Sequence, residues 1–309
     1  SAFAAVLSIV TQPEPRMLGL RSAILAVSVV VAANMRGLSL LWLAVAVLVP
    51  LLLATRTQLG ELLRSRGIRV AIVVSGVGVV AALAWIALSG SMTTRSADDT
   101  TSPDVPYLGS SPLAGFAIMI VRTGANIQQM IATFGWMDTT APVEVYAVWV
   151  WLIGALAGLG LLLARGRALR FVAVLFAAFL LLPAIAQGAF ITGGGYIWQG
   201  RYTLPLLVIL LLGAAWALSP QFDALTLRTR RALVITAWSL WGAAQLFAFA
   251  STLRRYAVGA EGSWGDALAA PNWAPPGGAP LLIALFAVVT AAIVVLAIRA
   301  SRHDGGDGS

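Results

Sequence analysis

Long apolar runs alternate with polar segments along the chain, and each long apolar run predicts a membrane-spanning helix. A helix needs about 20 apolar residues to cross the hydrocarbon core of a membrane. The pattern predicts an all-α polytopic integral membrane protein with about 8–9 transmembrane helices. The expected spans are 1–11 (partial), 18–34, 38–54, 69–90, 142–164, 171–190, 203–219, 232–250 and 280–299. The pair 18–34 and 38–54 is also compatible with two half-inserted helices.

The arginines predict how these spans are oriented. Fourteen of the twenty arginines lie in or beside the loops 12–17, 55–68, 165–170 and 220–231 and the C-terminal tail. Arginine is enriched in cytoplasmic loops, so we expect this side and the C-terminus to be cytoplasmic. The outer loops are then 91–141, 191–202 and 251–279. We expect one transmembrane domain over 1–309, with a flexible tail at 300–309. The chain opens inside an apolar run, which is typical of a fragment.

The amino-acid composition is typical of a membrane protein and excludes some kinds of metal site and catalytic site. Hydrophobic residues make up 60% of the chain and charged residues 10%, and the mean hydropathy is +0.90. The net charge of +8 is explained by the arginine-rich loops, so the lipid bilayer is the expected partner and no nucleic acid is expected. There is no cysteine, and the single histidine, His303, lies in the tail, which excludes a His–Cys metal site and a Ser-His-Asp triad. No cofactor is identified, and a divalent cation stays open.

The stretch 113–134 in the first outer loop has the pattern of an amphipathic helix rather than a span. At about 100° per residue, its polar side chains gather on one face and its large apolar side chains on the other. One interpretation is an interfacial helix with the polar face in water. The other is a polar face that lines a cavity, where Arg122 would offer a planar cation to a phosphate. The polar face comprises Arg122, Asn126, Gln129 and Thr133.

The segment GWMDTTAP, residues 135–142, follows this stretch. Gly135 is typical of the end of a helix, and Trp136 of an interfacial aromatic belt. Asp138 is a carboxylate among apolar residues at the membrane edge, where desolvation would raise its pKa toward that of a general base. A turn or capping role for Asp138 is the alternative.

A second polar and aromatic segment, GAFITGGGYIWQGRYTLPLL at 188–207, connects two predicted spans on the outer side. Its rings could be interfacial anchors, and Arg201 could snorkel to the lipid headgroups. Alternatively, the set could bind a phosphate or sugar hydroxyls through directed hydrogen bonds. The candidate ligand-binding side chains are Tyr196, Trp198, Gln199, Arg201 and Tyr202.

Together, GWMDTTAP and YIWQGRYTLPLL resemble the paired signature of a family of bacterial predicted membrane proteins, domain of unknown function 2142. The chain is similar to the C-terminal two thirds of such a protein. The resemblance implies that Gly135, Trp136, Asp138, Gln199, Gly200, Arg201, Tyr202 and Pro205 occupy the family's characteristic positions. The family is grouped with the GT-C glycosyltransferases, which take sugars from polyprenyl-phosphate donors on the outer face of the membrane.

The resemblance implies a GT-C-like, multi-pass protein of the bacterial inner membrane. The expected function is transfer from a polyprenyl-phosphate sugar donor in cell-envelope glycan assembly. Arg122 and Arg201 are expected at the donor phosphate, Gln199, Tyr202 and Trp136 at the sugar or acceptor, and Asp138 as the base. The usual first-loop carboxylate of GT-C enzymes has no counterpart here, which leaves enzymatic activity open. A transporter or flippase without ion coupling and a scaffold for envelope assembly are the alternatives, because no carboxylate lies mid-span.

Overall fold

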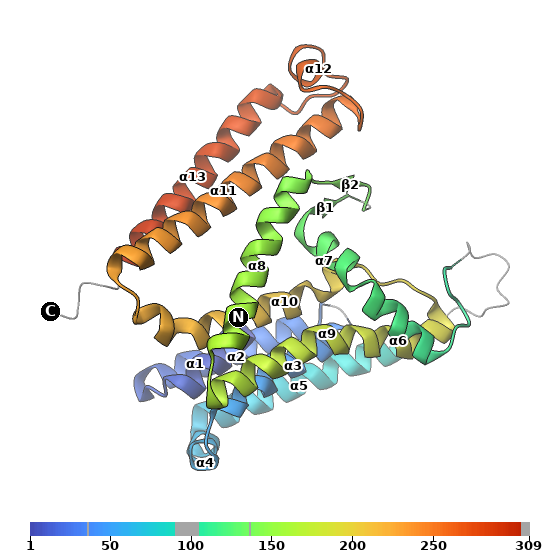
Figure 1. The fold of residues 1–309 in the computed structure, drawn as a ribbon. Helices are drawn as coiled ribbons and strands as arrows, with labels where there is room; N and C mark the ends of the chain where they lie inside the picture. The colour runs from blue at the N-terminus through green and yellow to red at the C-terminus, as the bar shows by residue number, and fades with distance from the viewer. Residues whose placement is uncertain (36, 90–104, 136, 304–309) are drawn as a thin grey trace. The chain divides into compact units, whose positions relative to one another are not determined.

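The computed structural model describes residues 1–35, 37–89, 105–135 and 137–303. It is almost entirely helical (Figure 1). Among the described residues, seven helices are long and apolar enough to cross a membrane. They are α2 (Pro15–Ala33), α5 (Arg66–Leu88), α8 (Val143–Leu163), α9 (Gly166–Gly194), α10 (Gly200–Asp223), α11 (Leu227–Val258) and α13 (Gly278–His303). The predicted all-α polytopic membrane protein is confirmed, and the lipid bilayer is its environment.

The remaining elements are short. Three apolar helices are α1 (Ala2–Thr11), α3 (Ser39–Leu48) with the 3-10 helix η1 (Val49–Leu53), and α6 (Pro112–Val121). The others are α4 (Arg56–Arg64), α7 (Thr123–Ala132), α12 (Trp264–Ala269) and the strands β1 (Thr133–Phe134) and β2 (Thr139–Thr140). The stretch 38–54, predicted as one span, is therefore an α-helix that tightens into a 3-10 turn. Pro50 lacks the N–H that an α-helix needs and its ring crowds the preceding turn.

The chain forms two compact units. The first comprises Ser1–Gly124 and Leu159–Ala217, and the second comprises Ala125–Gly158 and Leu218–Ser309.

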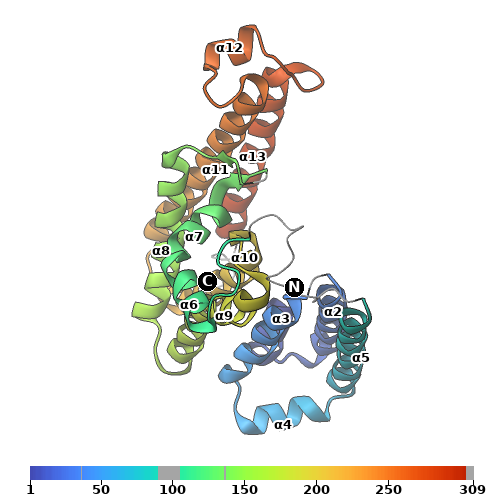
Figure 2. The ribbon, with the colours of Figure 1, turned by 90° about the vertical axis from the view of Figure 1, so that its right-hand side faces the viewer.

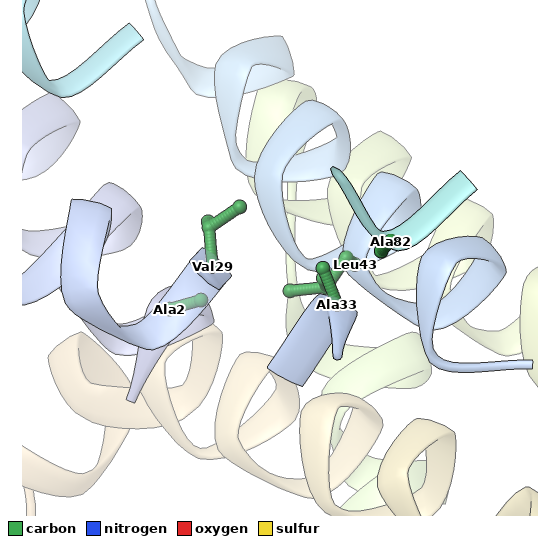
Figure 3. Close-up of a cluster of buried hydrophobic side chains, with 5 residues drawn as sticks. All are labelled: Ala2, Val29, Ala33, Leu43 and Ala82. Carbon is green, nitrogen blue, oxygen red and sulfur yellow. The ribbon is translucent and has the colours of Figure 1, made fainter. Parts of the chain in front are cut away.

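In the first unit, α2 packs along α5, and α6 packs along α9 (Figure 2). One apolar cluster joins α1, α2, α3 and α5 through Ala2, Val29, Ala33, Leu43 and Ala82, which Figure 3 shows in close-up. Small side chains dominate this cluster, so the helix backbones approach closely, as is usual where lipid supplies no hydrophobic driving force between helices.

In the second unit, α11 and α13 run side by side (Figure 1). The rings of Phe249 and Phe286 stack between them with centroids 4.1 Å apart. A smaller cluster joins the β1–β2 hairpin region, α8 and α11 through Ala132, Ala141, Val145, Ala244 and Ala248. This packing positions the hairpin beside the end of α11.

Candidate functional site

The segment before α6 is bound to the segment that ends α9. The backbone N–H of Gly109 donates to the carbonyl of Thr192 at 3.1 Å, and the N–H of Tyr196 donates to the carbonyl of Pro106 at 2.7 Å. The hydroxyl of Thr192 donates to the carbonyl of Ser110 at 2.9 Å. Parts of two predicted outer connections, about 80 residues apart in sequence, therefore lie against each other within the first unit.

Gly195 allows this close approach. Its φ of +68° lies in the left-handed region, and a Cβ there would stand 2.4 Å from Cγ1 of Val105. Its carbonyl accepts a 2.9 Å hydrogen bond from Nε2 of the buried Gln187. A larger residue at 195 would push the two segments apart.

Arg122 lies against two tyrosine rings brought together by this arrangement. Its guanidinium carbon is 4.7 Å from the ring centroid of Tyr196 and 5.6 Å from that of Tyr107. The two rings meet edge to face at 6.4 Å, and a guanidinium nitrogen donates to the Tyr107 hydroxyl at 3.4 Å. We call these three residues the Arg122 cluster. A guanidinium held over rings keeps its N–H donors in its own plane, at the edge of the group.

The predicted amphipathic helix 113–134 is two helices rather than one. Arg122 ends α6 with φ −83° and ψ 3°, and α7 begins at the next residue. Arg122 therefore belongs to the first unit, whereas Asn126 and Gln129 belong to the second. Asn126 is buried and Gln129 half-buried, so the predicted polar face is not a continuous stripe in water.

Trp198 is a packing residue in this structure. Its ring is buried, and its indole N–H donates to the hydroxyl of Thr203 at 2.9 Å. It meets Trp42 and Tyr202 edge to face, at 6.4 Å and 6.0 Å between centroids. With its only donor used and its ring buried, Trp198 anchors the start of α10, and its predicted contact with a ligand stays a prediction.

Gln199, Arg201 and Tyr202 form the first turn of α10 and its cap. The N–H of Tyr202 donates to the carbonyl of Gln199 at 2.9 Å. Arg201 is exposed, with its guanidinium carbon 5.8 Å from the Tyr202 ring centroid. Gln199 carries a buried amide oxygen with no hydrogen-bond donor among the described residues. Trp136, the remaining candidate, lies outside the described residues.

Asp138 belongs to a second cluster, in the second unit. The strands β1 and β2 pair antiparallel, with Thr133 opposite Thr140 and Phe134 opposite Thr139. Asp138 lies at the turn, 3.4 Å from a guanidinium nitrogen of Arg255 in α11. Nε of Arg255 donates to the buried Thr139 hydroxyl at 2.9 Å, and that hydroxyl donates to Asp138 at 3.4 Å. We call Asp138, Thr139 and Arg255 the Asp138 cluster.

The surroundings of Asp138 differ from the apolar environment expected from the sequence. About 60% of its side chain is exposed, against 30% for Arg255. The difference arises because Arg255 lies 117 residues away in sequence and reaches the hairpin only in the fold. The carboxylate is thus solvated and beside a cation.

The same turn explains Gly135 of the GWMDTTAP segment. Its φ is +63°, and a Cβ there would lie 2.6 Å from Oδ1 of Asp138 and 3.4 Å from the Tyr256 hydroxyl. Met137 in the same turn also has a positive φ, of 66°. Backbone held in this region by a side chain other than glycine is strained, and such strain concentrates at functional sites.

Several residues of these clusters carry no signal in the sequence. Tyr107, Thr139 and Arg255 are not among the predicted site residues. Thr139 follows Asp138 in the chain, whereas the fold brings Tyr107 beside Arg122 and Arg255 beside Asp138. Tyr107 shares the positive φ, at 62°. Within the described residues, no three His, Cys, Asp or Glu side chains gather in a way that could hold a metal ion. That no cofactor is identified, with a divalent cation left open, stays an expectation from the sequence.

The loop between α11 and α13 is held by a further arginine. Arg254 donates to the carbonyls of Gly262 and Ala260, and its guanidinium lies 5.7 Å from the Trp264 ring centroid. Ser263 and Asp266 form a reciprocal capping box at the start of α12. These contacts order the loop next to the end of α11.

The capping box predicts a pH effect. Hydrogen bonds from the side chain and then the backbone of Ser263 hold the pKa of Asp266 below its ordinary value of 3.8. Because the folded pKa is depressed, the stabilisation of α12 is present above pH 3.8 and is lost as pH falls through the lowered pKa. Replacing Ser263 with alanine is expected to raise the Asp266 pKa toward 3.8, which carboxyl-carbon NMR titration would measure. Identical titration curves for the two proteins would contradict the capping interpretation.

The fold defines a class, a multi-pass helical membrane protein. Within it, Arg122 ends the short helix α6 beside two tyrosine rings, and Arg255 lies near the end of α11 beside Asp138. The family model described as "Predicted membrane protein (DUF2142)" matches residues 1–210. The chain therefore belongs to the family of domain of unknown function 2142, as predicted from the two motifs. No curated protein and no solved structure matches it. The matched range includes the Arg122 cluster and Asp138, whereas Arg255 lies beyond it.

Proposed function

We propose that this protein is a membrane glycosyltransferase that uses a polyprenyl-phosphate-linked sugar. It would act on the extracytoplasmic face of the bacterial inner membrane, in cell-envelope glycan assembly. The observation that carries the proposal is the Arg122 cluster. The guanidinium of Arg122 is exposed, is flanked by two tyrosine rings and has no carboxylate partner among the described residues. One guanidinium nitrogen donates to the Tyr107 hydroxyl, and the other N–H groups of this planar cation are suited to bind a phosphate through parallel hydrogen bonds.

The backbone of both clusters supports a functional rather than a purely structural role. The positive φ values of Tyr107 and Met137 place one strained residue beside Arg122 and one beside Asp138. Strain of this kind persists only where surrounding contacts over-determine it. In the first unit those contacts are the backbone hydrogen bonds that tie 105–110 to 192–196. They pre-organise the tyrosine that flanks Arg122.

Each step of the proposed reaction has a candidate residue. The bond between the sugar's anomeric carbon and the phosphate oxygen breaks, and a new bond forms to the acceptor oxygen. Arg122, with Arg201, stabilises the charge left on the polyprenyl phosphate. A general base takes the acceptor's proton, and Asp138 is the candidate that the sequence offers for this role. Gln199 and Tyr202, with Trp136, contact the sugar or acceptor.

The test is transfer of a labelled sugar from a synthetic polyprenyl-phosphate donor by the purified full-length chain in lipid vesicles. Loss of the Arg201 guanidinium removes one charged hydrogen bond to the donor, so Arg201→Ala is expected to raise the donor KM about tenfold. Asp138→Asn is expected to lower kcat without changing the donor KM. The matched control is Arg228→Gln, which removes another exposed arginine from the start of α11.

Other outcomes would redirect the proposal. Unchanged turnover in both Arg201→Ala and Asp138→Asn would contradict the site. Movement of the labelled donor across the vesicle membrane without transfer would instead favour the transporter or flippase. Neither transfer nor movement would favour a scaffold.

A further inference from the structure

A further arginine site lies in the first unit, at the start of α5. Helix α4 connects the end of η1 to α5 (Figure 2). It is fastened to the unit by Leu62, which packs with Ile9 and Ile68, and by Gln58, whose amide donates to the carbonyl of Val10 at 2.7 Å. The start of α5 is therefore held in place.

Helix α5 has two distinct faces. Its buried residues, Ile68, Ala71, Gly78 and Ala82, recur at helical spacing and lie on the side that packs against α2. At about 100° per residue, Arg66, Arg69, Val70, Val73, Val74, Val77 and Val80 fall on the other side. All seven are exposed. Two guanidinium groups thus head a continuous stripe of valines on one helix face.

A shallow hollow of about 320 Å³ lies on this exposed face. It is lined by Arg66, Arg69, Val70, Val73 and Val74. Neither arginine forms an ion pair within the part of the chain that the structure describes. The hollow therefore combines two uncompensated positive charges with an apolar floor.

The dimensions fit an amphiphile in one leaflet. From Val70 to Val80 the stripe rises about 15 Å, which is half of a hydrocarbon core of about 30 Å. A soluble anion would bind the arginines without contacting the valines. The headgroup of a zwitterionic lipid would bring its own cation close to the two arginines. We propose that this face of α5 binds one anionic phospholipid, with its phosphate on Arg66 and Arg69 and an acyl chain along the valines. This site is independent of the proposed transferase activity.

Lipid retention by the purified full-length chain tests the proposal. The chain in detergent is mixed with equal amounts of phosphatidylglycerol and phosphatidylcholine of identical acyl chains, and bound lipids are counted by native mass spectrometry. Wild type is expected to retain phosphatidylglycerol preferentially. In Arg66→Gln/Arg69→Gln that preference is expected to fall about tenfold or more, since each arginine near a membrane surface contributes to binding of anionic lipid.

Three further variants distinguish lipid binding at this site from a general effect of positive surface charge. Arg228→Gln/Arg231→Gln removes two exposed arginines with the same spacing at the start of α11 and is expected to leave the preference unchanged. Val73→Trp fills the hollow and keeps both charges, so it is expected to reduce retention. Arg66→Lys/Arg69→Lys keeps both charges and is expected to retain most of the preference for phosphatidylglycerol. Together with Val73→Trp, it tests the site without relying on the folding of the glutamine variant.

Equal losses in the two glutamine double variants would overturn the proposal, because surface charge alone would then explain binding. Equal retention of both lipids by wild type would also overturn it. So would displacement of the lipid by excess inorganic phosphate, which would indicate a site for a soluble anion.

Discussion

Replacing Arg122 with glutamine is expected to lower transfer from a polyprenyl-phosphate sugar by about 10²–10³-fold. Glutamine keeps a planar polar end but loses the positive charge that stabilises the leaving phosphate. Arg122→Lys keeps the charge and loses the two-pronged geometry, so its defect is expected to be smaller, about tenfold. Steady-state kinetics with varied donor would measure both variants and separate kcat from KM.

The tyrosines of the Arg122 cluster provide the control for this result. Tyr196→Phe keeps the ring beneath the guanidinium, which lies 4.7 Å from the ring centroid, and is expected to keep most activity. Tyr196→Leu removes the ring and is expected to raise the donor KM, because Arg122 is then less well positioned. Wild-type kinetics in Arg122→Gln would exclude a role for this guanidinium at the phosphate.

Replacing Gly188 with leucine is expected to destabilise the protein by about 2–3 kcal/mol. A Cβ at this position would stand 2.7 Å from the carbonyl oxygen of Pro112 and 3.3 Å from the backbone nitrogen of Phe116. Backbone atoms cannot rotate away as a side chain can, so α6 has to move off α9. Reversible unfolding in mixed micelles of sodium dodecyl sulfate would give the change in free energy.

Gly154→Leu is the matched control, since a Cβ at Gly154 of α8 meets nothing within 4 Å. Its unfolding free energy is expected to stay close to that of wild type. If Gly188→Leu unfolded at the same detergent fraction as Gly154→Leu, the close packing of α6 on α9 would be wrong. The Gly188 variant is also expected to weaken donor binding, because α6 carries Arg122.

The sequence predicts the membrane architecture well because a run of apolar residues is a local property. Seven of the predicted spans correspond to long helices, and some of these helices extend well beyond the apolar runs. Helix α11 covers Leu227–Val258, whereas the predicted span was 232–250. Hydrophobicity measures the stretch inside the hydrocarbon core, and helical hydrogen bonding continues past it into polar residues. Within the predicted span 38–54, the α-helix gives way to the 3-10 helix that contains Pro50.

The site could be predicted only residue by residue. Arg122 and Tyr196 were separate candidates, and their contact depends on Tyr107 and on backbone hydrogen bonds between distant segments. From the sequence, Trp198 is a candidate for ligand binding or for an interfacial belt. Its burial depends on Trp42, which comes from another helix. Asp138 was expected among apolar groups, and its partner Arg255 arrives from α11. Contacts of such long sequence separation leave no periodic pattern to detect.

The length of α11 sets the distance between the hydrocarbon core of the membrane and the β1–β2 hairpin that carries Asp138. Its 32 residues rise roughly 48 Å, well beyond the approximately 30 Å of the acyl-chain region. Arg255 comes near the helix end, about 8 Å along the axis past the apolar run that closes near residue 250. With the span ending near residue 250, as the sequence predicts, the hairpin bound to Arg255 lies outside the hydrocarbon core, and we expect a water-borne molecule rather than a lipid tail to reach the Asp138 carboxylate.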